Sequence, residues 1–152
     1  MRRIFLYMLV FSLAFSSNSC TKDPSPSYSG NSVTTKVGGL EKTFNTVVVT
    51  QEPYTSGGVN YVDLKITATN KGNTTESLVF SIGKGDLGVG HSWGFNYTIN
   101  GVYYAEGDMP TTVSSDATIN SDNKLKGTFN GTVTSSENVT LQLTEGTFDV
   151  SY

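Results

Sequence analysis

Apolar and polar side chains alternate along most of the chain after residue 31, and this period of two constrains the fold more than any other feature. The alternation is clearest in four segments, at residues 62–68, 78–82, 139–143 and 148–152. Successive side chains of a strand point to opposite faces, so each segment has one buried and one solvated face. No window of ten residues keeps a helical period. The sequence therefore predicts an all-β domain.

Turn-forming residues separate these segments at short intervals. Glycine and asparagine are favoured in tight turns because they tolerate a positive φ angle. Turn signals occur at six places: Gly38-Gly39, Gly57-Gly58, Asn70-Lys71-Gly72, Asn100-Gly101, Ser121-Asp122-Asn123 and Glu145-Gly146. Strands joined by such short turns pair as antiparallel hairpins. We predict an antiparallel β-sandwich of about eight to ten short strands, with a small closed β-barrel as the alternative.

The Asn100-Gly101 pair is the strongest hairpin signal, and it fixes a register. A type I′ turn at these two residues places Thr98 opposite Tyr103. The other face of this hairpin carries six apolar residues and is predicted to be core: Trp93, Phe95, Tyr97, Ile99, Val102 and Tyr104. Tyr103 is predicted to be exposed, where its ring and a threonine hydroxyl can contact a ligand. Tyr103 and Thr98 are the candidate ligand-binding residues.

The N-terminal segment is typical of a secretory signal. Arg2 and Arg3 precede an apolar run, and a short stretch of small polar residues then leads to Cys20. The apolar run is too short to span a bilayer of about 30 Å. The sequence Ser-Asn-Ser-Cys at residues 17–20 resembles the lipobox of bacterial lipoproteins, although an aliphatic residue is more usual at its first position. Cys20 is therefore predicted to carry a lipid.

The chain is predicted to have three parts. The segment 21–30 is polar and contains two prolines, a composition that does not pack into a core. The predicted parts are a lipoprotein signal peptide (1–19), the lipidated Cys20 with a flexible tether (20–31) and the β domain (32–152). The lipid predicts attachment to the outer membrane, with the domain facing the periplasm or the cell surface.

Charge and cysteine content exclude several functions. Loss of Arg2 and Arg3 with the signal peptide leaves eight basic side chains against 13 acidic ones, a net charge of −5. Nucleic acid repels such a chain, so we expect no nucleic-acid partner. Cys20 is the only cysteine, which excludes an internal disulfide and a thiolate metal site. No cofactor and no metal ion is predicted.

The C-terminal third contains two motifs. The first is Leu-Lys-Gly-Thr-Phe at residues 125–129, and the second is the Gly-Thr-Phe of residues 146–148 within the apolar alternation of 139–150. With these motifs the chain resembles a family of small Bacteroidetes lipoproteins of uncharacterised function, in which a Gly-Thr-Phe strand precedes a closing strand pair that carries G-x-F. The resemblance extends more loosely over most of 32–152. It implies an envelope lipoprotein with a β domain and supplies no catalytic residues.

Few residues offer other chemistry. Residues 83–88 match the dinucleotide-binding pattern G-x-G-x-x-G, but a strand is predicted to follow them instead of the helix that would hold a pyrophosphate. We interpret this segment as a glycine-rich loop that can carry a binding site. His91 is the only histidine, and the acids Glu106 and Asp108 share a predicted turn that could bind calcium.

These observations favour a non-enzymatic envelope lipoprotein whose β domain binds a glycan, a peptide or an envelope protein. A hydrolase that uses His91 or the Glu106/Asp108 loop is one alternative, and a structural envelope component is another. Convergence of these three residues with Asp86 in one cleft would favour the hydrolase.

Overall fold

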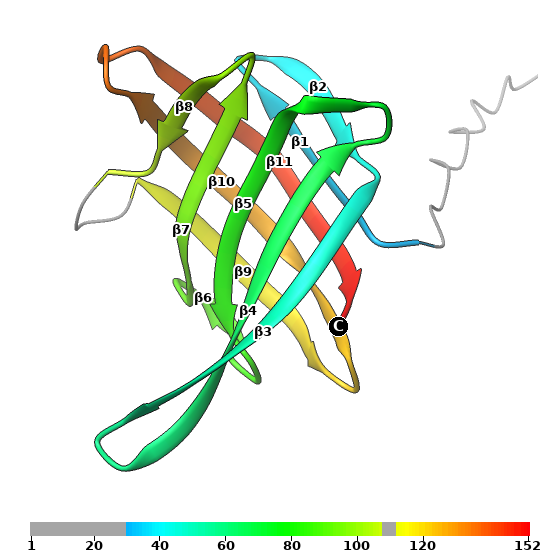
Figure 1. The fold of residues 1–152 in the computed structure, drawn as a ribbon, viewed down its shortest axis with the longest axis vertical. Helices are drawn as coiled ribbons and strands as arrows, with labels where there is room; N and C mark the ends of the chain where they lie inside the picture. Colours follow the sequence, from blue (N-terminus) through cyan, green and yellow to red (C-terminus); the bar gives the residue numbers. More distant parts are fainter. Residues whose placement is uncertain (1–29, 108–111) are drawn as a thin grey trace, which may run out of the picture.

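The computed structural model describes residues 30–107 and 112–152, and these residues form an all-β domain (Figure 1). They contain eleven strands, all paired antiparallel, and the all-β prediction is confirmed. The strands are β1 (Ser32–Val37), β2 (Leu40–Phe44), β3 (Thr46–Ser56), β4 (Val59–Asn70), β5 (Asn73–Gly83), β6 (Gly88–Val89), β7 (Ser92–Ile99), β8 (Val102–Ala105), β9 (Val113–Ser121), β10 (Lys124–Ser135) and β11 (Thr140–Ser151). Within the same residues, no helix is long and apolar enough to cross a membrane.

All the described strands belong to one sheet, which curls into a half-barrel (Figure 1). The hydrogen-bonded order is β2-β1-β11-β10-β8-β7-β5-β4-β3, and β9 pairs with β10 and with the short β6. The chain passes from β2 to β3 through Asn45 alone, so a single residue joins the two ends of this order. Because one continuous sheet curls on itself, the architecture resembles the predicted barrel alternative more than a sandwich of two separate sheets.

The curled sheet encloses an apolar core that is rich in phenylalanine. Phe80 and Phe95 stack with their ring centroids 4.7 Å apart, and Phe129 and Phe148 pack against Phe80 at 5.9 and 5.5 Å. All four rings are buried. Burial of a side chain of this size contributes about 1.5–3 kcal/mol to stability. The predicted alternation in 62–68 and 78–82 is confirmed from residue 64 onward, because Leu64, Ile66, Ala68, Leu78, Phe80 and Ile82 are fully buried. Val62, the first apolar member, is only partly buried.

A β-bulge in β7 corrects the prediction for Trp93. Between Trp93 and Asn96, β7 has two residues, Gly94 and Phe95, where the partner strand β5 has one. Gly94 has φ of +69°, a left-handed conformation that favours glycine. The extra residue turns Trp93 to the outside, where it is 39% exposed. The predicted core position of Trp93 is therefore wrong, whereas Phe95 and Tyr97 are buried as predicted.

A second bulge joins two predicted strands into one. The predicted turn at Glu145-Gly146 lies inside β11, where Glu145 has φ of +51° and the register with β10 shifts. The prediction of a turn is wrong because a left-handed residue can also make a bulge, which lets the strand continue in the same direction. Val139 and Val102 were also predicted to be core, but Val139 precedes β11, Val102 begins β8, and the two are 48% and 46% exposed.

The β3–β4 hairpin projects beyond the half-barrel (Figure 1). Pairing of β4 with β5 ends at Asp63 and Gly83, whereas pairing of β4 with β3 continues to the predicted turn at Gly57-Gly58. Residues 53–62 therefore form a two-stranded extension, which we call the arm. Since no third strand covers it, its side chains are largely exposed.

Several predictions concern residues outside the described part of the chain. These are the signal peptide over 1–19, the lipid on Cys20, the tether up to residue 29, and Asp108. Asn31, the last residue of the predicted tether, is hydrogen-bonded to β11: the Ser151 amide donates to Asn31 Oδ1 at 2.8 Å. The chain therefore enters the domain beside its C-terminal strand.

Candidate functional site

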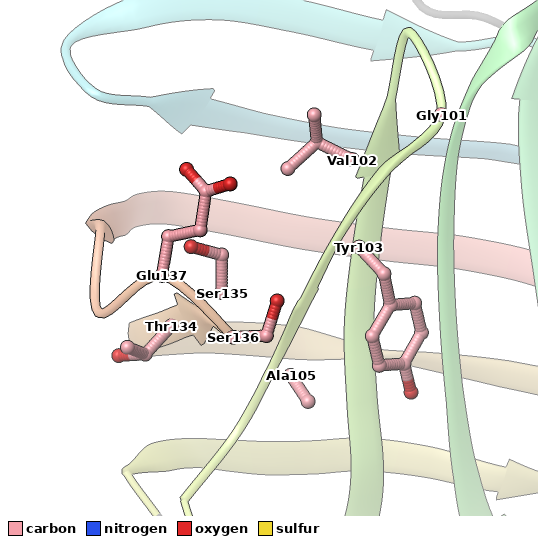
Figure 2. A pocket seen from close by; sticks show the side chains of 8 residues that line it. All are labelled: Gly101, Val102, Tyr103, Ala105, Thr134, Ser135, Ser136 and Glu137. Atoms are coloured by element: carbon pink, nitrogen blue, oxygen red, sulfur yellow. The ribbon is translucent and has the colours of Figure 1, made fainter.

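Tyr103 lines a notch between β8 and the turn that follows β10 (Figure 2). β8 pairs with β10 through only two residue pairs, and β10 ends at the second of them, Ser135. The resulting cavity has a volume of about 560 Å³. It is lined by Gly101, Val102, Tyr103, Ala105, Thr134, Ser135, Ser136 and Glu137. We call this cavity the notch.

The polar groups of the notch and its aromatic ring do not face a common point. Tyr103 is 56% exposed and lies opposite Thr98, as the hairpin register predicted. In Figure 2 the Tyr103 ring extends on one side of β8, whereas Ser135 and Glu137 lie on the other side. A ligand that contacts Glu137 would therefore not stack on Tyr103. Ligand binding by Tyr103 and Thr98 stays a prediction.

A second cavity collects three exposed aromatic side chains at the base of the arm. Its volume is about 370 Å³, within the range of roughly 300–1,000 Å³ that is usual for ligand pockets. It is lined by Tyr54, Asn60, Tyr61, Val62, Asp63, Gly83, Lys84, Asp86 and Trp93. We call this cavity the groove. Tyr54 and Tyr61 are each 45% exposed, a fraction close to that of Trp93.

The arm and the bulge, not the core, place these aromatic rings. Tyr54 and Tyr61 are register partners, and their rings stack with centroids 5.3 Å apart and planes 20° apart. Such a cross-strand pair stabilises a hairpin that no third strand supports. Trp93 reaches the same cavity because the bulge at Gly94 turns it outward. Exposed rings around a cavity provide a surface for sugars or amines.

Gly83 and Asp86 form the floor of the groove. The Asp86 carboxylate lies over Gly83, where the Cβ of any other residue would overlap it. Asn120, a buried residue of β9, holds this loop: its Nδ2 donates to the carbonyl oxygens of Gly83 at 2.8 Å and of Asp86 at 2.9 Å. The Tyr152 hydroxyl donates in turn to Asn120 Oδ1 at 3.2 Å. The predicted glycine-rich loop thus contributes to a cavity, with Asp86 fixed in place.

The carboxylates give the groove a negative character. Removal from solvent, followed by the charges of Glu52 and Asp86, raises the pKa of Asp63 above its usual value of 3.8. Removal from solvent, followed by the charge of Asp63, also raises the pKa of the Tyr54 hydroxyl. Lys84 also lines the groove but forms no ion pair with these acids: its Nζ donates to Gln51 Oε1 at 3.2 Å and lies 5.1 Å from the centre of the Tyr152 ring.

The candidate hydrolytic residues converge only in part. His91 Nδ1 lies 3.9 Å from Asp86 Oδ2, and both side chains are about half exposed, at 47%. Glu106 instead accepts a hydrogen bond from the Gly94 amide, and neither Glu106 nor His91 lines the groove. Among the described residues, no three His, Cys, Asp or Glu side chains could together hold a metal ion.

No family model, no curated protein and no solved structure matches this chain. Lipidation at Cys20 and the resemblance to Bacteroidetes lipoproteins stay predictions.

Reasoning from the sequence missed three residues of the groove, Tyr54, Tyr61 and Asp63. One signal was available, because Tyr54 and Tyr61 lie at equal distances on either side of Gly57-Gly58 and must therefore pair in a hairpin. Their exposure has no such signal, since it arises from the early end of β5.

Proposed function

We propose that this chain is a lipid-anchored envelope protein whose β domain binds a glycan in the groove and catalyses no reaction. The observation that carries this proposal is the gathering of Tyr54, Tyr61 and Trp93, all exposed, around one cavity with carboxylates in its floor. Sugar rings have apolar faces that stack on aromatic rings, and hydroxyls that donate hydrogen bonds to carboxylates. The groove offers both kinds of contact.

The groove supports a glycan better than the notch does. The notch has one aromatic ring, which does not face its polar groups, whereas the groove has three rings on its rim. The stacked Tyr54–Tyr61 pair also fixes two rings in place before a ligand arrives. Such preorganisation reduces the entropy lost on binding. A peptide or an envelope protein bound at the notch remains the alternative partner.

Trp93→Ala and Tyr61→Ala should each weaken glycan binding by about threefold to tenfold, because each removes one stacking surface. Binding of the full chain to a panel of soluble oligosaccharides, measured by calorimetry, tests this. Tyr103→Ala is the matched control, since it removes an exposed aromatic ring from the notch instead of the groove. Its affinity should equal that of the wild type.

Three results would contradict the proposal. If the chain bound no oligosaccharide of the panel, the proposed glycan ligand would be contradicted. If only Tyr103→Ala lost affinity, the binding site would be the notch instead of the groove. Hydrolysis of a panel member that disappears in His91→Ala would show an enzyme. Melting curves of the variants should match the wild type, because all three side chains lie outside the core.

Cys20→Ala should abolish attachment of lipid, since Cys20 is the only cysteine in the chain. Labelling of cells with a palmitate analogue measures this, and the wild-type chain expressed in the same cells is the reference. The variant should leave the membrane fraction. Label on Cys20→Ala would show that the anchor lies elsewhere, and absence of label from the wild type would contradict the anchored state.

A further inference from the structure

Two carboxylates meet at one point of the groove floor. Asp63 is on the outer face of β4, and its register partner on β5 is Gly83. The Asp86 carboxylate lies over this same glycine. Because Gly83 has no side chain, no β5 side chain separates the two acids, and the charge of Asp86 is one of the causes that raise the pKa of Asp63.

The lysines near this point form no ion pair with either acid. Lys84 contacts Gln51 and the Tyr152 ring, as described above. Lys65 pairs with Glu52, the cross-strand neighbour of Asp63, with 3.6 Å between Nζ and Oε1. His91 is near Asp86 alone and is half exposed. No lysine of the described residues forms an ion pair with Asp63 or Asp86, so the floor keeps its negative charge.

Asp63 also has an unused hydrogen-bond acceptor. Its Oδ1 is shielded from solvent and has no hydrogen-bond partner among the described residues. A carboxylate with one shielded, unpaired oxygen is costly to keep charged, and a cation that contacts its other oxygen from the groove reduces this cost. The aromatic rings at the rim favour the same kind of ligand, because the faces of tyrosine and tryptophan attract cations.

We infer that the groove selects a glycan that contains an amino sugar with a free, protonated amine, and that this ammonium group binds between Asp63 and Asp86. The inference rests on the proposed glycan-binding function and names the class of sugar. The ammonium group donates to the accessible oxygens of the Asp63 and Asp86 carboxylates, while the sugar ring stacks on Tyr54, Tyr61 or Trp93. Acetylation of the amine removes both its charge and two of its donors, so an N-acetylated sugar loses these contacts.

Calorimetry with three tetrasaccharides tests the inference on the full chain: a glucosamine tetramer, an N-acetylglucosamine tetramer and a glucose tetramer, at a pH where the amine is protonated. We expect the glucosamine tetramer to bind at least about tenfold more tightly than the other two. Asp63→Asn and Asp86→Asn should each remove most of this preference, because each should weaken binding of the glucosamine tetramer far more than binding of the glucose tetramer, which keeps its stacking contacts and loses at most one hydrogen bond.

Asp149→Asn is the matched control for non-specific attraction, which an acidic chain exerts on any polycation. Asp149 is an exposed carboxylate on β11 that pairs with Lys124 and Lys126 at 3.4 and 3.5 Å. It is not part of the groove. The preference for the amine should persist in this variant. A loss as large as that in Asp63→Asn would show non-specific attraction and overturn the inference.

The stability of Asp63→Asn shows whether the variant is folded. The raised pKa of Asp63 means that folding disfavours its charged form. The resulting loss of stability is absent below pH 3.8, the pKa in the unfolded chain, and grows as the pH rises toward the higher pKa of the folded chain. At about pH 7, Asp63→Asn should therefore melt at the wild-type temperature or up to about 4 °C above it. Its lost preference for the amine then cannot come from unfolding.

The remaining outcomes separate the inference from the proposed function. Equal affinity for the three tetrasaccharides would overturn the amino-sugar inference and leave the glycan-binding proposal intact. A preference for the amine that survives in both Asp63→Asn and Asp86→Asn would place the ammonium group elsewhere and would also overturn the inference. Absence of binding to all three, and to the wider panel, would contradict the proposed function itself.

Discussion

Deletion of residues 148–152 should unfold the domain. These residues form the end of β11, which pairs with β1 on one side and with β10 on the other. Phe148 and Val150 are each 1% exposed, and Tyr152 packs against the core. Burial of each such side chain contributes about 1.5–3 kcal/mol, whereas a domain of this size has a total stability of about 5–15 kcal/mol. The deletion therefore removes most of the free energy of unfolding.

Far-ultraviolet circular dichroism during heating measures this effect. The truncated chain should lack a cooperative transition, whereas Asp149→Ala, an exposed position in the same segment, should melt within a few degrees of the wild type. A truncated chain with a wild-type melting curve would show that the end of β11 is peripheral to the core. The deletion also removes the Tyr152 hydroxyl that orients Asn120, so any folded remainder should bind ligand more weakly.

The strand pattern and one hairpin register could be predicted from the sequence because both depend on local chemistry. Alternation in 62–68 follows from burial of one face of a strand, and the Asn100-Gly101 turn sets Thr98 opposite Tyr103 through its own geometry. The position of Trp93 could not be predicted in this way. A single left-handed glycine at residue 94 reverses the face of the residue before it, and alternation alone does not reveal a bulge.

The groove depends on tertiary geometry to a greater extent than the strands do. Tyr54 and Tyr61 are exposed because β5 stops pairing at Gly83 while the β3–β4 hairpin continues. The juxtaposition of Asp63 with Asp86 requires both this register and the loop held by Asn120. No short sequence motif predicts either the register or the position of this loop. The glycine-rich loop could be recognised in the sequence, but its position beside Asn120 of β9 could not.

Glu76→Ala should lower the free energy of unfolding by about 3–5 kcal/mol, because Glu76 is the centre of a buried polar network. Glu76 is 4% exposed. Its Oε1 lies 2.9 Å from Lys42 Nζ and accepts a hydrogen bond from the Tyr97 hydroxyl at 2.5 Å, and its Oε2 accepts one from Asn70 at 3.3 Å. In the sheet order, Lys42 on β2 is far from Glu76 on β5, so this ion pair bridges the curl of the sheet across its interior.

Removal of the Glu76 carboxylate leaves the Lys42 ammonium and the Tyr97 hydroxyl without their partner in a shielded position. The expected fall in Tm is about 10–20 °C. Lys36→Ala is the control, because its ion pair with Glu145 at 2.6 Å is exposed and should contribute no more than about 1 kcal/mol. An equal effect of the two variants would mean that the Glu76 network is no stronger than a surface pair.

Ultraviolet titration of Tyr97 tests the same network independently of unfolding. Burial, followed by the hydrogen bond to Glu76 and its charge, holds the pKa of Tyr97 far above the usual value of 10.0. In Glu76→Gln, which keeps the shape of the side chain, the charge is lost and the pKa of Tyr97 should fall toward the value that burial alone produces. An unchanged Tyr97 pKa in a folded Glu76→Gln variant would mean that the two side chains do not interact. The buried network would then consist of the Glu76–Lys42 ion pair without Tyr97.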